Sequence, residues 1–166
     1  MFKINKKING KLGLSSDKIY AKYNLVKSFE SRIKFTNGNI LIDQFLFSLG
    51  KLGAADISGT INNNEKFTNF KYESNLFIDD QKKFLSKFGV YNKKSIPFSL
   101  FVSGNFDLQN IRSSFYEISD NEKLSNEDVN FIEEEFNDFM LTDGYKNLFR
   151  FPQFVEFVKS ITSEIN

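Results

Sequence analysis

The sequence predicts a mainly β protein, built as an antiparallel, coiled meander sheet with a short helical insertion and a C-terminal helical hairpin. Three observations support this fold class. Apolar and polar residues alternate up to about residue 118, Asn- and Gly-rich turns separate the alternating runs, and helical spacing replaces the alternation after residue 118. At 166 residues the chain is long enough to bury a substantial core as one domain with a small appendage.

The clearest predicted strand runs from Phe98 to Leu108, where apolar residues and Gly104 fill the even positions and most odd positions are polar. The same alternation predicts strands over residues 19–25 and 70–78. Asn37-Gly38-Asn39 lies between two such runs, and Asn and Gly tolerate the positive φ of tight turns. Short turns between adjacent strands predict an antiparallel meander.

A short helix is predicted between two of the strands. Asp79-Asp80 precedes residues 81–88 and Gly89 follows them, which is typical of an acidic N-terminus and a glycine stop. Phe84, Leu85 and Phe88 are expected to face inward. This helix could cap one edge of the sheet.

Two further helices are predicted after residue 118. Ser125 is a suitable N-cap for a first helix, and Pro152 suits the first turn of a second one. Their apolar residues recur at helical spacing, which favours packing against the sheet and also permits docking to a membrane surface or a partner protein. We therefore divide the chain into a β segment, residues 1–118, and an acidic and apolar helical tail, residues 119–166.

Charge divides the chain at nearly the same place. Residues 1–115 hold 18 Lys and Arg against 9 Asp and Glu, whereas residues 116–166 hold 4 against 12. The basic part could meet an anionic partner such as phospholipid headgroups or nucleic acid, or its lysines could simply be solvated on strand faces. Most Phe residues fall on apolar faces and are expected to be buried, so nucleic acid is not the favoured partner.

The composition argues against an enzyme. The chain contains no His and no Cys, which removes the usual general base, the commonest zinc ligands and the thiolate nucleophile. The sequence also lacks a nucleophile elbow, a Walker loop and a dinucleotide-binding glycine motif. We predict no catalytic residues, no metal site and no cofactor.

A five-residue pattern recurs three times, consisting of an apolar residue, Asn or Ser, Gly, a polar residue and an apolar residue. The copies are residues 8–12, 57–61 and 102–106, and their glycines are 49 and 45 residues apart. Such spacing is typical of a repeated multi-strand unit that buries its apolar face only when neighbouring units stack on it. In each copy the glycine is expected on the apolar face, where it gives room or lets the sheet coil.

On these repeats, the long alternating strands and the helical insertion, the chain resembles the C-terminal region of AsmA-like proteins, relatives of the TamB-type bacterial envelope proteins. The resemblance covers about residues 4–118. It implies an elongated, taco-like sheet whose apolar groove carries phospholipid acyl chains between the inner and outer membranes. It also implies a periplasmic location with an inner-membrane anchor outside this chain, which we therefore expect to be a C-terminal fragment.

The expected function is thus a non-enzymatic lipid groove that supports phospholipid transport or outer-membrane assembly. Lysines at the rims of such a groove could meet lipid phosphates. The candidate groove residues are Leu12, Leu14, Ile57, Ile61, Leu100, Val102, Phe106 and Leu108. The same residues would equally line the core of a closed sandwich or barrel. The alternative function is a structural or protein-interaction β domain whose helical tail docks an envelope protein.

Overall fold

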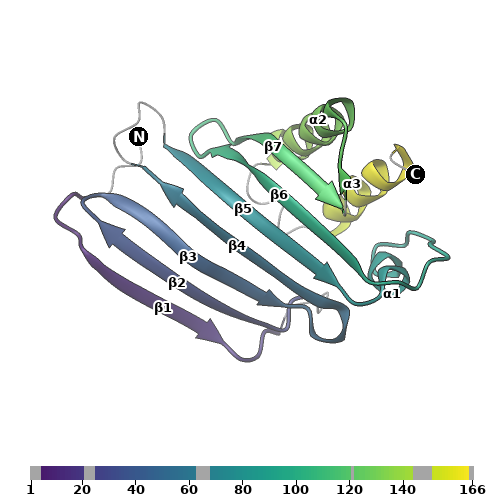
Figure 1. The fold of residues 1–166 in the computed structure, drawn as a ribbon, viewed down its shortest axis with the longest axis horizontal. Helices are drawn as coiled ribbons and strands as arrows, with labels where there is room; N and C mark the ends of the chain where they lie inside the picture. The colour runs from purple at the N-terminus through teal and green to yellow at the C-terminus, as the bar shows by residue number, and fades with distance from the viewer. Residues whose placement is uncertain (1–4, 21–24, 63–67, 121, 144–150, 165–166) are drawn as a thin grey trace.

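The computed structural model describes residues 5–20, 25–62, 68–120, 122–143 and 151–164. They form one open antiparallel sheet of seven long strands and a two-residue eighth strand, arranged in the order of the sequence, together with three α-helices (Figure 1). The strands are β1 (Gly10–Ser16), β2 (Ser28–Thr36), β3 (Asn39–Ser48), β4 (Gly53–Ile61), β5 (Asn69–Ile78), β6 (Phe98–Asp107), β7 (Arg112–Asp120) and β8 (Glu122–Lys123). The helices are η1 (Gly50–Leu52), α1 (Gln81–Ser86), α2 (Asn126–Asp143) and α3 (Phe151–Glu164).

The antiparallel meander, the short helical insertion and the C-terminal helical region are confirmed. The turn between β2 and β3 has Asn37 at φ 52° and Gly38 at φ 85°, both in the left-handed region that Asn and Gly tolerate. This turn lets β2 and β3 pair directly, from Thr36 opposite Asn39 onwards.

The strand predicted over residues 19–25 is wrong at residues 19, 20 and 25, which are not in a strand. Residues 21–24 lie outside the described residues. Ile19 and Leu25 belong to the long connection between β1 and β2. The Ile19 N–H donates to the Lys27 carbonyl at 2.7 Å, and the Lys27 N–H donates to the Ser48 carbonyl at 2.8 Å. These bonds tie the connection to the end of β3. The apolar alternation of the connection therefore does not produce a strand that pairs with a neighbour.

The strand register gives the sheet one apolar and one polar face, because directly opposed residues of neighbouring strands point to the same side. We call the first side the apolar face. Its large apolar residues are Leu12, Leu14, Phe29, Ile33, Phe35, Ile40, Ile42, Phe45, Phe47, Ile57, Ile61, Phe70, Tyr72, Leu76, Ile78, Phe98, Leu100, Val102, Phe106, Phe115 and Ile118.

Two bulges keep this segregation where strict alternation in the sequence fails. In β3 the register shifts between Ile42 and Phe45, and in β7 it shifts between Phe115 and Glu117. Each bulge inserts one extra residue and so returns the next apolar side chain to the apolar face. Period-two counting alone would place Phe45 and Ile118 on the polar side.

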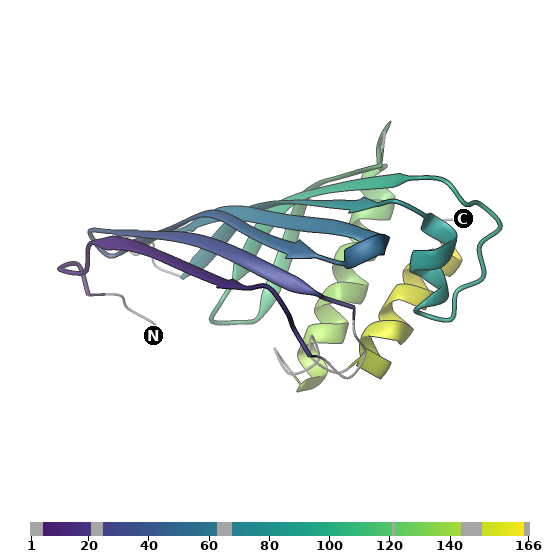
Figure 2. The same cartoon turned by 90° about the horizontal axis from the view of Figure 1, so that it is seen from below.

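Helices α2 and α3 lie on the apolar side of the sheet, next to β7 (Figures 1 and 2). Ser113 and Phe115 donate their backbone N–H groups to Asn137 Oδ1 at 2.7 Å and Glu133 Oε2 at 2.8 Å. Asn137 Nδ2 in turn donates to the Ser113 carbonyl at 3.0 Å. Glu133 and Asn137 are four residues apart and share one face of α2, which therefore takes the place of a further strand along this edge.

A connected network of phenylalanine rings joins the helices to each other and to the sheet. Neighbouring ring centroids in it lie 5.1 to 6.3 Å apart, within the range of favourable aromatic pairs. The rings belong to Phe84, Phe88, Phe115, Phe136, Phe139, Phe151, Phe154 and Phe157. The predicted inward positions are confirmed, since Leu85 and Phe88 are buried and Phe84 is half-buried, although α1 ends at Ser86 and Phe88 lies in the turn that follows it.

Candidate functional site

The apolar face is covered by helices at one end only. α2 packs on β7 and α3 packs on α2, and Figures 1 and 2 show no α-helix of the described part over β1 to β3. On β1 to β4, every described large apolar side chain of this face accordingly keeps part of its surface exposed. Leu12 and Leu14 are 41% and 48% exposed. The apolar face is therefore incompletely buried at its β1 end, and exposed apolar patches in proteins are often interaction sites.

A pocket of about 500 Å³ lies where the helices meet the sheet. Strands β5, β6 and β7 form one wall, and α1, α2 and α3 form the others. Its apolar lining residues are Leu76, Phe84, Leu85, Phe98, Leu100, Val102, Phe115, Ile118, Leu124, Ile132, Phe136, Phe157, Val158 and Ile161; its polar ones are Gln81, Asn92, Lys94, Asp120 and Thr162. Small-molecule sites have volumes of roughly 300–1,000 Å³ and the same mixture of a mainly apolar lining with a few polar groups.

The structure brings seven of the eight predicted groove residues onto the apolar face. Leu100 and Val102 line the pocket and pack against the buried core around Ile118. The other five belong to the part of the face outside the pocket lining: Leu12, Leu14, Ile57, Ile61 and Phe106. The predicted set is therefore split between an enclosed part and an open part of one face.

Leu108 departs from the prediction that it continues the strand. β6 ends at Asp107, and the Asp107 carboxylate accepts the N–H groups of Gln109 and Asn110 at 2.8 and 3.0 Å. This carboxylate turn bends the chain away from the sheet, and the Leu108 N–H donates to the Thr68 carbonyl at 3.0 Å.

Most of the pocket lining was missed by sequence reasoning. Leu76 could have been found, because it belongs to the alternating run over residues 70–78. The helical residues Ile132, Phe136 and Phe157 carry the helical period, but this period does not show which part of the sheet they face. Their meeting point depends on the edge bonds from α2 to β7.

Two of the repeat glycines form a row with a tyrosine across the middle of the apolar face. Gly59 lies opposite Tyr72 in β5, and Tyr72 lies opposite Gly104 in β6. The Tyr72 side chain lies over Gly104, and its hydroxyl is 3.1 Å from the Ser113 hydroxyl in β7. The expectation that the repeat glycines give room on the apolar face is confirmed for Gly59 and Gly104.

Burial raises the pKa of the Tyr72 phenol from 10.0 to about 12, and the hydrogen bond with Ser113 partly offsets this effect.

Between pH 10 and 12 the folded chain keeps a proton on Tyr72 that the unfolded chain has lost. The free energy of unfolding should therefore fall as pH rises through this range, and Tyr72→Phe should remove that part of the fall. Near-ultraviolet absorbance should show one phenolate forming later than those of the remaining tyrosines; a wild type and a variant with the same titration curve would contradict this assignment.

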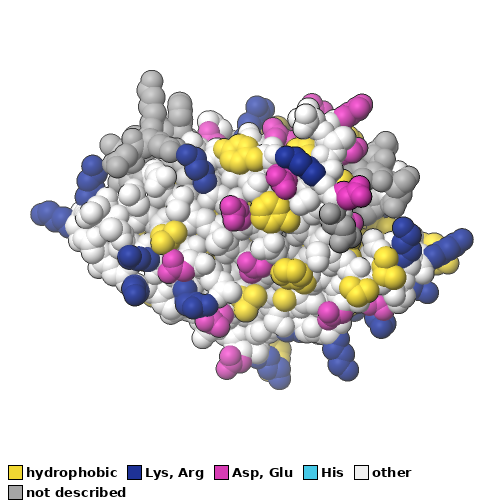
Figure 3. Space-filling model, in the orientation of Figure 1, with side chains coloured by type: hydrophobic (Ala, Val, Ile, Leu, Met, Phe, Trp, Pro, Cys, Tyr) yellow, Lys and Arg dark blue, Asp and Glu magenta, His cyan; other side chains and the backbone are white. Residues whose placement is uncertain are grey.

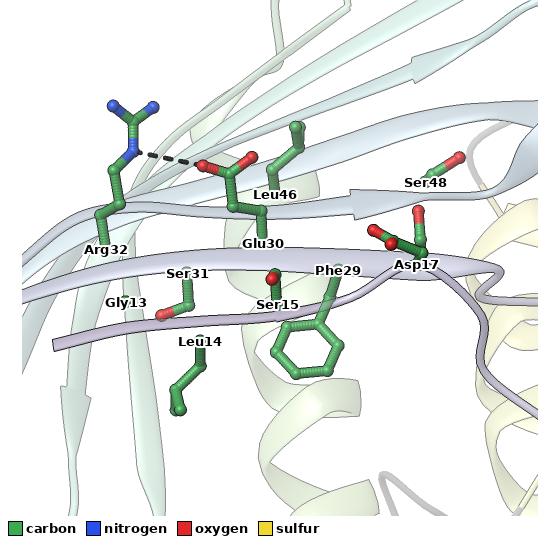
Figure 4. A pocket seen from close by; sticks show the side chains of 11 residues that line it. Gly13, Leu14, Ser15, Asp17, Phe29, Glu30, Ser31, Arg32, Leu46 and Ser48 are labelled. Atoms are coloured by element: carbon green, nitrogen blue, oxygen red, sulfur yellow. Dashed lines mark ion pairs between the residues drawn. The ribbon is translucent and has the colours of Figure 1, made fainter.

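The polar face has a different character. Figure 3 shows the side away from α2 and α3, where Lys, Arg, Asp and Glu side chains alternate with isolated hydrophobic ones. A depression of about 480 Å³ lies at its β1–β2 end, where Glu30 and Arg32 form an exposed ion pair at 3.7 Å. Leu14 and Phe29 point to the opposite side of the sheet from this pair (Figure 4). The polar face thus offers no continuous apolar surface within the described residues.

The described residues contain no group of three or more His, Cys, Asp or Glu side chains placed to hold a metal ion. The carboxylates of Glu133 and Asp80 serve structural contacts, the first to the β7 edge and the second to the N-terminus of α1. None of the described helices is both long and apolar enough to span a membrane.

No protein-family model, curated protein or solved structure matches this chain. The resemblance to AsmA-like proteins therefore stays a prediction from the sequence patterns.

Proposed function

We propose that this chain is a non-enzymatic lipid-binding segment whose apolar sheet face and adjoining pocket hold acyl chains. The observation that carries the proposal is the continuity of the two sites. Leu100 and Val102 line the pocket, and the same strand face continues through Leu76 and Ile57 to half-exposed residues on β1 to β4. An acyl chain is apolar and extended, so it fits an apolar surface that runs across strands and ends in a pocket.

The polar residues of the pocket suit an amphipathic ligand. Lys94 is exposed while Leu100 and Phe98 line the same pocket half-buried, so the pocket reaches solvent beside a cation. The ammonium group of Lys94 can meet an anionic headgroup in water while the acyl chain contacts the apolar lining. Phospholipid transport or outer-membrane assembly in a bacterial envelope is the setting we propose for this binding, following the AsmA-like pattern of the sequence.

The alternative function is a structural β domain whose helical tail docks a partner protein. The apolar helical residues that would dock a partner are already packed within the chain. Val129, Ile132 and Met140 of α2 are buried, and α3 packs through its phenylalanines. These contacts favour the lipid-binding proposal over docking through the same apolar stripes.

The proposal can be tested with two neighbouring residues that point to opposite faces of β5. Leu76 lines the pocket, whereas Phe77 is 51% exposed on the polar face. Leu76→Asp should weaken binding of a fluorescently labelled fatty acid by roughly tenfold or more, because a carboxylate would have to be desolvated in an apolar site. Phe77→Asp should leave the affinity unchanged.

A second pocket variant removes the risk that the aspartate only disturbs folding. Thr162→Phe adds volume to the lining without adding charge, and the hydroxyl it removes donates within α3 to the Val158 and Lys159 carbonyls, at 2.8 and 3.2 Å. It should weaken fatty-acid binding while the far-ultraviolet circular dichroism stays that of the wild type. Equal affinity in the wild type, Leu76→Asp and Thr162→Phe would rule out the pocket as the binding site.

A further inference from the structure

The two edges of the sheet differ in whether other parts of the chain cover their outward backbone groups. Along β7, side chains of α2 satisfy the outward N–H groups of Ser113 and Phe115. β1 lies at the opposite end of the strand order, with β2 as its one neighbour among the described strands, and six of its seven residues are exposed. An uncovered edge strand is a template for pairing with another strand.

β1 has few of the features by which proteins usually block such an edge. It has no proline, and its seven residues pair with β2 in an unbroken register, from Gly10 opposite Phe35 to Ser16 opposite Phe29. Its single charged residue, Lys11, lies on the polar face, while Leu12 and Leu14 lie on the apolar one. The edge is therefore regular and partly apolar, which favours pairing.

We propose that β1 pairs with β1 of a second copy of this chain, antiparallel, about a twofold axis through Gly13. The sequence of β1 is self-complementary in this register. Leu12 lies opposite Leu14 of the second copy, Lys11 lies opposite Ser15, and Gly10 lies opposite Ser16. No two like charges face each other, and Gly13 on the axis brings no side chain against its counterpart.

The pairing extends the apolar face. A twofold axis perpendicular to the sheet leaves both copies with their apolar sides on the same side of the joined sheet. Leu12 and Leu14, which are 41% and 48% exposed in one copy, then contact each other across the junction. This covers the most exposed apolar side chains of the face and doubles its length, whether or not the face binds lipid.

The oligomeric state of the full chain tests the proposal. Sedimentation equilibrium should give about twice the 19.3 kDa of one chain. The double variants Leu12→Lys, Leu14→Lys and Leu12→Glu, Leu14→Glu should each be monomeric, because like charges then face each other across the junction. Mixing the two variants should restore a dimer, since every introduced lysine then lies opposite an introduced glutamate.

Leu41→Lys is the matched control, because Leu41 is also an exposed strand leucine at 38% but lies on the polar face of β3. It should remain dimeric. A monomeric wild type, or dimers in both charged double variants, would overturn the proposal. Charged variants that stay monomeric after mixing would overturn the register about Gly13. None of these outcomes depends on lipid binding, so the dimer and the proposed function fail separately.

Discussion

Phe88→Ala should lower the free energy of unfolding by about 3–5 kcal/mol, the largest loss we expect from one substitution outside the sheet. Phe88 is 1% exposed, and its ring lies 5.1 Å from that of Phe84, 5.7 Å from that of Phe151 and 5.8 Å from that of Phe154. Phe88 follows the end of α1, so removing its ring leaves a cavity against α3 and removes the ring contacts that join Phe84 of α1 to Phe151 and Phe154 of α3. Urea unfolding followed by circular dichroism would measure the change.

The matched control for Phe88 is Phe77, whose ring is 51% exposed on the polar face. Phe77→Ala should cost less than about 1 kcal/mol, because little area is removed from burial. The same loss for both substitutions would mean that the phenylalanine network does not hold α1 and α3 together. Loss of this network should also weaken fatty-acid binding, since α1 and α3 form two walls of the pocket.

Gly59→Val and Gly104→Val should each destabilise the sheet by about 3 kcal/mol, at the upper end of the usual cost of overpacking. A Cβ on Gly59 would lie 2.3 Å from the Lys71 carbonyl oxygen, and one on Gly104 would lie 2.6 Å from the Ser114 carbonyl oxygen. Both obstacles are backbone atoms, so relief requires a shift of a neighbouring strand. Thermal and urea unfolding of each variant would measure the cost.

Gly10 provides the control within the same repeated pattern. A Cβ at Gly10 would meet no atom within 4 Å, and valine is favoured in strands. Gly10→Val should therefore change stability by less than about 0.5 kcal/mol. If Gly10→Val were as damaging as Gly104→Val, the pattern itself rather than the crowding at Gly59 and Gly104 would be responsible.

Much of the fold could be predicted because local signals agree with the tertiary structure. Alternation of apolar and polar residues correctly predicted the strands near residues 70–78 and 98–107. Asn37-Gly38 correctly predicted the tight turn that joins β2 to β3. Asp80 caps α1 as expected, with the Lys83 N–H donating to its carboxylate at 3.0 Å. Ser125 likewise caps α2, accepting the Asp128 N–H at 3.1 Å.

The remaining features depend on contacts that a single strand or helix does not encode. The bulge after Ile42 returns Phe45 to the apolar face, and a strict period of two cannot show where such an extra residue falls. The pocket depends on Asn137 and Glu133 reaching the backbone of β7. Both residues are polar, and in the sequence they resemble the solvated side of an ordinary helix.

The central claim is tested most directly by native mass spectrometry of the wild-type chain purified from a bacterial host, with lipid extraction from the same sample. We predict a species heavier than the bare polypeptide, 19.3 kDa for one chain or twice that for the dimer, by the mass of bound phospholipid or fatty acid, with that lipid recovered in the extract. The Leu76→Asp variant should be folded and lipid-free, and Phe77→Asp should carry lipid. A well-folded wild type without bound lipid would contradict the lipid-binding function and favour a structural or protein-interaction domain.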